Sequence, residues 1–300
     1  MNRRSFLSGF SSLPFFSTLV SSAEEINKKN KSAILLWMGG GPSTMDIWDL
    51  KPGAPTGGPF RPINTSGDVQ ICEHMPLMAK QMHNAAIIRS MSTREADHMR
   101  GRYYMHTGYV PNPSIDHPSY GSVISHQSPR PDLSIPKFIS VGGGSVGAGF
   151  LGSKYAPFSV NSDGRIRNLD VKVDQRFYQR AYALDAIETG FINQRRGSLA
   201  KEHQSVLKEA FNVLTSSQMD ALKVAGEPEN VKERYGNNSF GKGCLMARRL
   251  VEAGVPFIEV NLGGWDNHQN IHPTLRDNKL PMLDQGMSAL FEDLEQRGLL

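Results

Sequence analysis

The 300-residue sequence has little net charge and no long apolar run after its first 23 residues. The formal net charge is +4, and Arg3 and Arg4 supply two of those charges, so composition gives no support for nucleic-acid binding. No later segment reaches the roughly 18 apolar residues that a membrane-spanning helix needs. Glycine and proline show no period, which excludes collagen and solenoid repeats. Because 39% of the residues are hydrophobic, we expect a folded core.

Cysteine is also scarce, with only Cys72 and Cys244 present. Neither belongs to a CxxC or CxxH pattern, so the cysteines predict no zinc ribbon or redox motif. An oxidising compartment would permit a disulfide between them. Two unpaired thiols are the favoured interpretation, and the pairing stays open.

Common nucleotide-binding and nucleophile motifs are missing as well. The sequence contains no P-loop, no dinucleotide-binding fingerprint and no nucleophile elbow. The run GGSVG at 143–147 matches none of them at the required spacing.

The first 23 residues predict an export signal. Arg3 and Arg4 precede Ser5-Phe6-Leu7, an apolar stretch continues to Val20, and small residues follow before Glu24. The paired arginines resemble the twin-arginine signal, whose translocon carries folded proteins. We therefore expect a periplasmic or secreted protein that meets this translocon, with a linker at 24–31. A helix that stays attached, or an uncleaved anchor, is the alternative.

The remaining chain, 32–300, predicts one α/β domain with a mostly parallel central sheet and helices on both faces. Continuous apolar runs predict strands at 32–38, 85–89, 138–141 and 257–262. Helical patterns lie at 76–82, 97–106, 120–127, 239–253 and 284–297. A helical insertion is expected at about 171–224, with its second long helix at about 200–222. We expect 225–238 to be a polar loop.

Carboxylates and imidazoles follow three of the predicted strands, where open parallel sheets bind ligands. The first strand is followed by Asp46 and Asp49, the second by Asp97 and His98, and the last by a Trp-Asp-Asn-His motif containing Asp266 and His268. Mixtures of aspartate and histidine suit Zn²⁺, Mn²⁺, Mg²⁺ or Ca²⁺. We therefore expect a divalent metal site at this edge of the sheet.

Each of these residues also has a structural interpretation. Asp46 could cap the turn after the glycine loop, Asp49 could lie beside Lys51 in solvent, and Asp97 could be the N-cap of its helix. Six further histidines are expected not to be ligands: His272, His117 and His126 at the surface or around the site, and His74, His83 and His203 on the surface.

Long blocks of the sequence resemble a family of exported bacterial proteins grouped as domain of unknown function 1501. The blocks include LLWMGGGPSTMDIWDLKP, DHMRGRYYMHTGYVP, CLMARRLVEAGVPFIEVNLGGWDNHQN and LPMLDQGMSALFEDLEQRGLL, and the similarity spans 33–300. This family is sulfatase-like, is placed in the alkaline phosphatase superfamily and is typical of Planctomycetes-type proteomes.

The resemblance implies hydrolysis or transfer at sulfate or phosphate esters by two metal ions and a nucleophile at a helix N-terminus. Thr107-Gly108 resembles the Thr-Gly pair that follows the nucleophile helix, which places His98 at the nucleophile position. Asp266 and His268 match the metal-ligand region. The carboxylate of the first strand would fall near Gly39, so Asp46 or Asp49 would replace it. Asp284 matches an acidic helix position, and the family pattern continues past Leu300 into a further strand and Asp/His motifs.

We therefore expect a metal-dependent hydrolase acting on a small-molecule or carbohydrate ester. His98 and Asp97 are the candidate catalytic residues, and Asp46, Asp49, Asp266 and His268 are the candidate metal ligands. Because His98 stands where a nucleophile would, metal-bound water is the expected attacking group. The alternative is a catalytically inactive, sulfatase-like binding or scaffold protein that associates with carbohydrate. Aromatic residues would then line the site, with these candidates: Trp48, Tyr103, Tyr104 and Trp265.

Overall fold

The computed structural model describes residues 31–165, 174–193, 204 and 211–300. Its centre is a four-stranded parallel sheet in the order β1-β6-β4-β5. The strands are β1 (Ala33–Trp37), β4 (Phe138–Val141), β5 (Phe158–Val160) and β6 (Phe257–Asn261). This confirms an α/β fold with a mostly parallel sheet.

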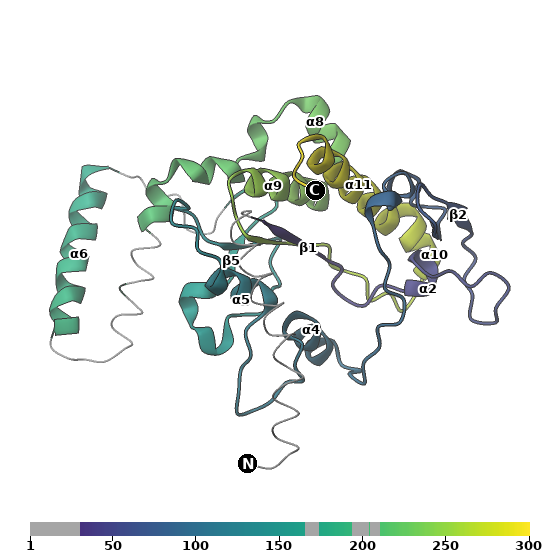
Figure 1. Ribbon diagram of the computed structural model, residues 1–300, viewed down its shortest axis with the longest axis horizontal. Helices are drawn as coiled ribbons and strands as arrows, with labels where there is room; N and C mark the ends of the chain where they lie inside the picture. Colours follow the sequence, from purple (N-terminus) through teal and green to yellow (C-terminus); the bar gives the residue numbers. More distant parts are fainter. Residues whose placement is uncertain (1–30, 166–173, 194–203, 205–210) are drawn as a thin grey trace, which may run out of the picture.

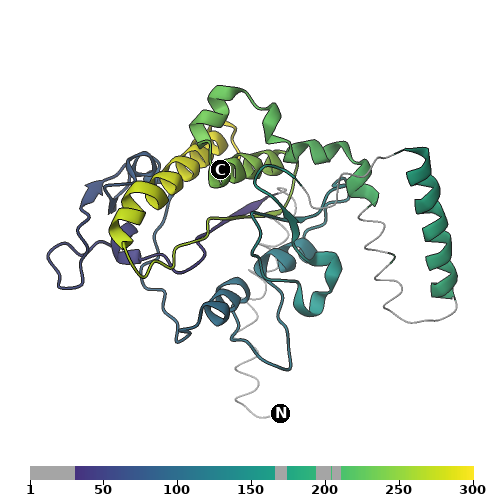
Figure 2. The ribbon, with the colours of Figure 1, turned by 180° about the vertical axis from the view of Figure 1, so that it is seen from behind.

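Helices cover both faces of this sheet. On one side lie α8 (Glu229–Tyr235), α9 (Ser239–Glu252) and α11 (Leu280–Gln296), and on the other lie α4 (His98–Thr107) and α5 (Tyr120–Gln127) (Figures 1 and 2). Strand residues alternate between the two faces. Val141 and Val260 face α9, where Gly243 lets the helix approach, while Phe138 and Phe257 face Gly121 of α5.

A second, antiparallel pair of strands lies beside α11. It consists of β2 (Pro62–Asn64) and β3 (Gln70–Cys72) and is followed by the short helix α3 (Pro76–Ala79). The buried carboxylate of Asp284 in α11 accepts hydrogen bonds from the backbone N–H groups of Leu77 (3.0 Å) and Met78 (2.6 Å). Asp284 thus caps α3, and its burial raises the pKa of the carboxyl group.

The remaining short elements connect these layers. They are α2 (Thr44–Ile47), η1 (Met82–Asn84), η2 (Gly149–Leu151), η3 (Ser153–Tyr155), η4 (Ser217–Leu222), η5 (Val224–Gly226), α10 (Ile271–Thr274) and the π-helical turn η6 (Leu275–Lys279) that leads into α11. Helix α6 (Gln175–Asn193) lies at the periphery (Figure 1). None of the helices in the described part of the chain has the length and apolar character to cross a bilayer.

Two local predictions were wrong. The apolar segment at 85–89 pairs with no strand among the described residues, and Ile88 is exposed. An apolar segment forms a stable strand only where a neighbouring strand pairs with its backbone N–H and C=O groups. The segment 225–238, predicted as a loop, contains α8. Most of the predicted second helix of the insertion, at about 200–222, lies outside the described residues.

The two cysteines are both buried and unpaired. Burial raises the pKa of the Cys72 thiol to about 11, and it also raises the pKa of Cys244 in α9. The structure therefore agrees with two separate thiols rather than a disulfide.

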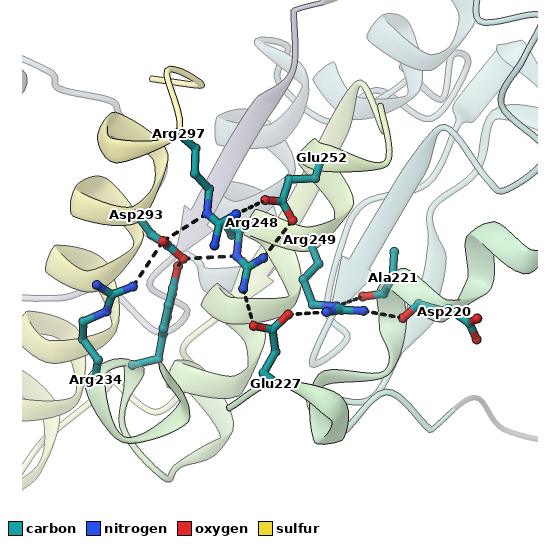
Figure 3. Close-up of polar contacts among 10 residues, drawn as sticks. Asp220, Ala221, Glu227, Arg234, Arg248, Arg249, Glu252, Asp293 and Arg297 are labelled. Carbon is teal, nitrogen blue, oxygen red and sulfur yellow. Dashed lines mark hydrogen bonds and ion pairs between the residues drawn. The ribbon is translucent and has the colours of Figure 1, made fainter. Parts of the chain in front are cut away.

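A buried arginine organises the contact between α9, α11 and the segment before α8. Arg248 pairs with Glu227 (Nη2–Oε2 2.8 Å), Glu252 (Nη1–Oε2 2.8 Å) and Asp293 (Nε–Oδ2 3.1 Å) (Figure 3). Burial alone would lower the pKa of Arg248, but the hydrogen bonds to the two glutamates outweigh it and raise that pKa. We call this set, with Tyr235, Arg234, Arg249 and Arg297, the Arg248 cluster.

Candidate functional site

The loops after β1 and β6 meet because these strands are parallel neighbours. The Gly39 N–H donates to the Leu262 carbonyl (3.1 Å), and the Trp265 N–H donates to the Gly39 carbonyl (3.1 Å). Gly40 has φ +115°, and a Cβ there would lie 2.7 Å from the backbone nitrogen of Asp266. Glycine at position 40 therefore permits the close approach that places Asp266 at the sheet edge.

Three of the predicted site residues converge at this edge. The Nε2 atom of His98 lies 3.1 Å from one carboxylate oxygen of Asp266, and the Nε2 atom of His268 lies 2.9 Å from the other. Their side chains are 63%, 48% and 82% exposed for His98, Asp266 and His268 respectively. A helix and a loop distant in sequence thus present two imidazoles and one carboxylate to solvent.

The other three predicted residues have different partners. Asp97 is the N-cap of α4 and accepts from the Arg100 N–H (3.0 Å), as its structural interpretation proposed. Asp49 pairs with Lys51 (2.9 Å) and Arg89 (3.5 Å).

Asp46 is buried in α2 and pairs with the Nε2 atom of His272 at 3.4 Å. Gly58 lies against this pair, since a Cβ there would contact both side chains. His272, predicted at the surface or around the site, is partly exposed and forms a second His–Asp pair with Asp46. Across the described residues, no group of three or more His, Cys, Asp or Glu is arranged to hold a metal ion as the side chains stand.

The buried polar contacts between α4 and β6 were missed by sequence reasoning. The side chains of His106 in α4 and Glu259 in β6 are 2% and 0% exposed, and His106 Nε2 lies 3.3 Å from the Glu259 carboxylate. The other ring nitrogen of His106 faces the Arg102 carbonyl (2.8 Å), and the Ser145 hydroxyl donates to Glu259 (2.5 Å). This pair fixes α4, which carries His98, to β6, which leads to Asp266. In the sequence, this buried pair was signalled by Glu259, a glutamate inside the otherwise apolar strand FIEVN.

Arg102 lies on the same face of α4 as His98, one helical turn further along. Its Nη2 atom donates to the Ser145 carbonyl (2.9 Å), and its Nε atom is buried without a hydrogen-bond partner. No carboxylate among the described residues forms an ion pair with it. A guanidinium without a carboxylate partner is suited to an anionic ligand.

A hollow of about 390 Å³ lies away from these residues, next to β5. Lys137, Tyr155 and Phe158 are among its lining residues, and it contains none of the six predicted site residues. The chemistry-bearing side chains therefore lie on an open edge rather than in this hollow.

Comparison with known proteins identifies the chain at the level of its family. No curated protein matches the sequence, and no solved structure matches the fold significantly. A family model described as "Protein of unknown function (DUF1501)" matches residues 30–300. The chain therefore belongs to the DUF1501 family.

Proposed function

We propose that this protein is an exported, metal-dependent hydrolase of sulfate or phosphate esters with a sulfatase-like fold. The observation that carries the proposal is the convergence of His98 and His268 on the two oxygens of Asp266. Two imidazoles and a carboxylate form a common ligand set for Zn²⁺ and Mn²⁺. Because all three side chains are exposed, the proposal has them rotate to face one cation in place of one another.

The bound cation would polarise the ester oxygen and lower the pKa of a water molecule. The side chains around it have separate roles. Arg102, one turn from His98, would attract the anionic sulfate or phosphate group through the charge of its guanidinium, which has no carboxylate partner among the described residues. The buried His106–Glu259 pair would hold α4 and β6 in register, and Asp97 would fix the first turn of α4 that presents His98.

Metal titration of the purified full chain tests this proposal. After removal of metal by a chelator, Zn²⁺ or Mn²⁺ should bind and restore hydrolysis of 4-nitrophenyl sulfate or 4-nitrophenyl phosphate. Asp266→Asn should weaken metal binding at least tenfold. Asp277→Asn is the matched control, because Asp277 is an exposed aspartate paired with its neighbour Arg276 (2.7 Å). Equal affinities for the wild type and Asp266→Asn would overturn the metal site.

The export part of the proposal rests on the first 23 residues and has its own test. Replacing Arg3 and Arg4 by lysine removes the planar guanidinium groups and should leave the precursor inside the cell. Cell fractionation measures this. Arrival of the doubly substituted precursor in the periplasm in unchanged amount would contradict twin-arginine export.

A further inference from the structure

An exposed aromatic stack lies at the end of α4 opposite His98. The rings of Tyr109 and His117 are parallel within 5°, with centroids 3.9 Å apart. Phe150 meets His117 edge-on, with centroids 6.1 Å apart. Tyr109 is 55% exposed and Phe150 is 68% exposed. We call these three residues the aromatic platform.

The backbone around the platform is held in place. The hydroxyl of Thr107 accepts from the Tyr109 N–H (3.1 Å), and the phenol of Tyr103 accepts from the His117 N–H (2.6 Å). The Phe150 N–H donates to the Asp116 carbonyl (3.0 Å). Exposed aromatic rings on a fixed backbone lose little conformational entropy when a ligand covers them.

The chain segments that carry the platform hold little charge of their own. Val110, Ile115 and Tyr120 are exposed nearby in sequence. The segments 108–128 and 142–152 contain no lysine or arginine, and Asp116 is their only carboxylate. Binding to nucleic acid, anionic lipid or a sulfated polymer requires cations, so the platform is unsuited to each of them.

The remaining chemistry fits a sugar. Pyranose rings present C–H faces that pack on aromatic rings, while their hydroxyl groups need hydrogen-bond partners at the rim. Asp116 and Asn112 are exposed beside the platform and can supply such partners, as can the hydroxyl of Tyr109. A neutral sugar chain therefore matches both the apolar rings and the absence of cations.

We propose that the aromatic platform binds a neutral polysaccharide chain. Because α4 has ten residues, the platform lies roughly 15 Å from His98, too far to share the metal site. The sequence-based candidates for such a role differ from these residues: Trp265 is buried and donates its indole N–H to the Leu262 carbonyl (2.7 Å), and Tyr103 lies beneath the platform as a support.

Affinity electrophoresis of the full chain tests the proposal, with barley β-glucan, xylan or galactomannan in the gel. At least one of these neutral polysaccharides should retard the wild type. Phe150→Ala and Tyr109→Ala should each weaken retardation by about tenfold in apparent affinity, as loss of a central aromatic contact does. Tyr182→Ala is the matched control, because Tyr182 is 74% exposed on the distant helix α6.

Two further measurements separate the possible outcomes. Asp266→Asn should keep full retardation, so that failure of the metal site and failure of the platform are distinguishable. Light scattering of the wild type and Phe150→Ala shows whether the platform instead joins two copies of the chain. Absence of retardation in all three gels, equal weakening by Tyr182→Ala, or a dimer that only Phe150→Ala abolishes would each overturn the proposal.

Discussion

The Arg248 cluster and the His98–Asp266–His268 site both combine aspartate with basic side chains, but they differ in burial. Asp293 is buried and contacts Arg248, Arg297 (3.1 Å) and the Tyr235 hydroxyl (2.9 Å) (Figure 3). Asp266 is about half exposed, and its ion-pair partners among the described residues are two exposed imidazoles.

This difference separates a cluster that is closed to solvent from one that is open to it. In the Arg248 cluster the surrounding protein satisfies the charges, and opening it would expose unpaired buried groups. At the Asp266 site all three side chains are exposed, so the proposed cation would replace contacts that solvent already reaches. Four predictions test this distinction.

The largest effect is expected from Arg248→Met. This substitution leaves Glu227, Glu252 and Asp293 without their central partner, and it should lower the free energy of unfolding by about 3–5 kcal/mol. Urea unfolding measures the change. Arg276→Met, at an exposed pair, should stay within about 0.5 kcal/mol. Similar losses in both variants would show that burial does not distinguish the two pairs.

A smaller effect should appear in acid. Burial opposes ionisation of Asp293, but its hydrogen bonds from Tyr235 and Arg297 prevail and hold its pKa below the ordinary 3.8. A lowered pKa in the folded state gives stability that is present above the ordinary value and lost as the pH falls below it. The urea concentration at the unfolding midpoint of the wild type should therefore decrease as the pH is lowered below about 4. Asp293→Asn should show a flatter pH dependence from a lower starting stability, and an unchanged slope would argue against this linkage.

Gly40→Ala should affect both stability and the site. Its positive φ and the proximity of Asp266 should together cost about 1–3 kcal/mol. Gly53→Ala is the matched control, since Gly53 also has positive φ (+78°) but nothing lies within 4 Å of a Cβ there. Only Gly40→Ala should also weaken Zn²⁺ binding. Equal metal affinity in both variants would mean that the glycine loop does not position Asp266.

The smallest effect is expected from Asp97→Ala. Loss of the N-cap should cost about 1 kcal/mol and fray the first turn of α4. Amide hydrogen exchange should become faster at residues 98–101, with no change in α5. If exchange in this turn is unaltered, Asp97 does not hold His98 in place.

Much of the sheet could be predicted from local sequence, because a parallel strand buried on both faces is a continuous apolar run. The runs at 33–37, 138–141 and 257–261 form strands, whereas the equally apolar run at 85–89 does not. The composition of a segment indicates that it can be buried, but it does not indicate which strand would pair with it. Helix α8 was missed because Pro228 and Gly236 flank a charged seven-residue segment that resembles a loop.

The site was predictable to a similar extent. Asp266 and His268 follow β6, a predicted strand that forms, so their place at the edge of the sheet could be expected. The strand predicted before His98 does not form, and His98 reaches Asp266 from the first turn of α4 instead. The contacts of Arg102 and of the His106–Glu259 pair depend on how α4 packs on the sheet, which no local pattern specifies. The same holds for Asp284, whose carboxylate reaches a helix more than 200 residues away in sequence.

The two buried thiols make the protein a reporter of its own local unfolding. The thiolate is the form that attacks a thiol reagent, and both thiols are buried with raised pKa values, so labelling must wait for an opening of the structure. Cys72 lies in the β2–β3 pair, whereas Cys244 lies in α9 against α11. The order in which they react therefore shows whether the small antiparallel pair detaches before the central layer separates, and no cysteine has to be introduced for this experiment.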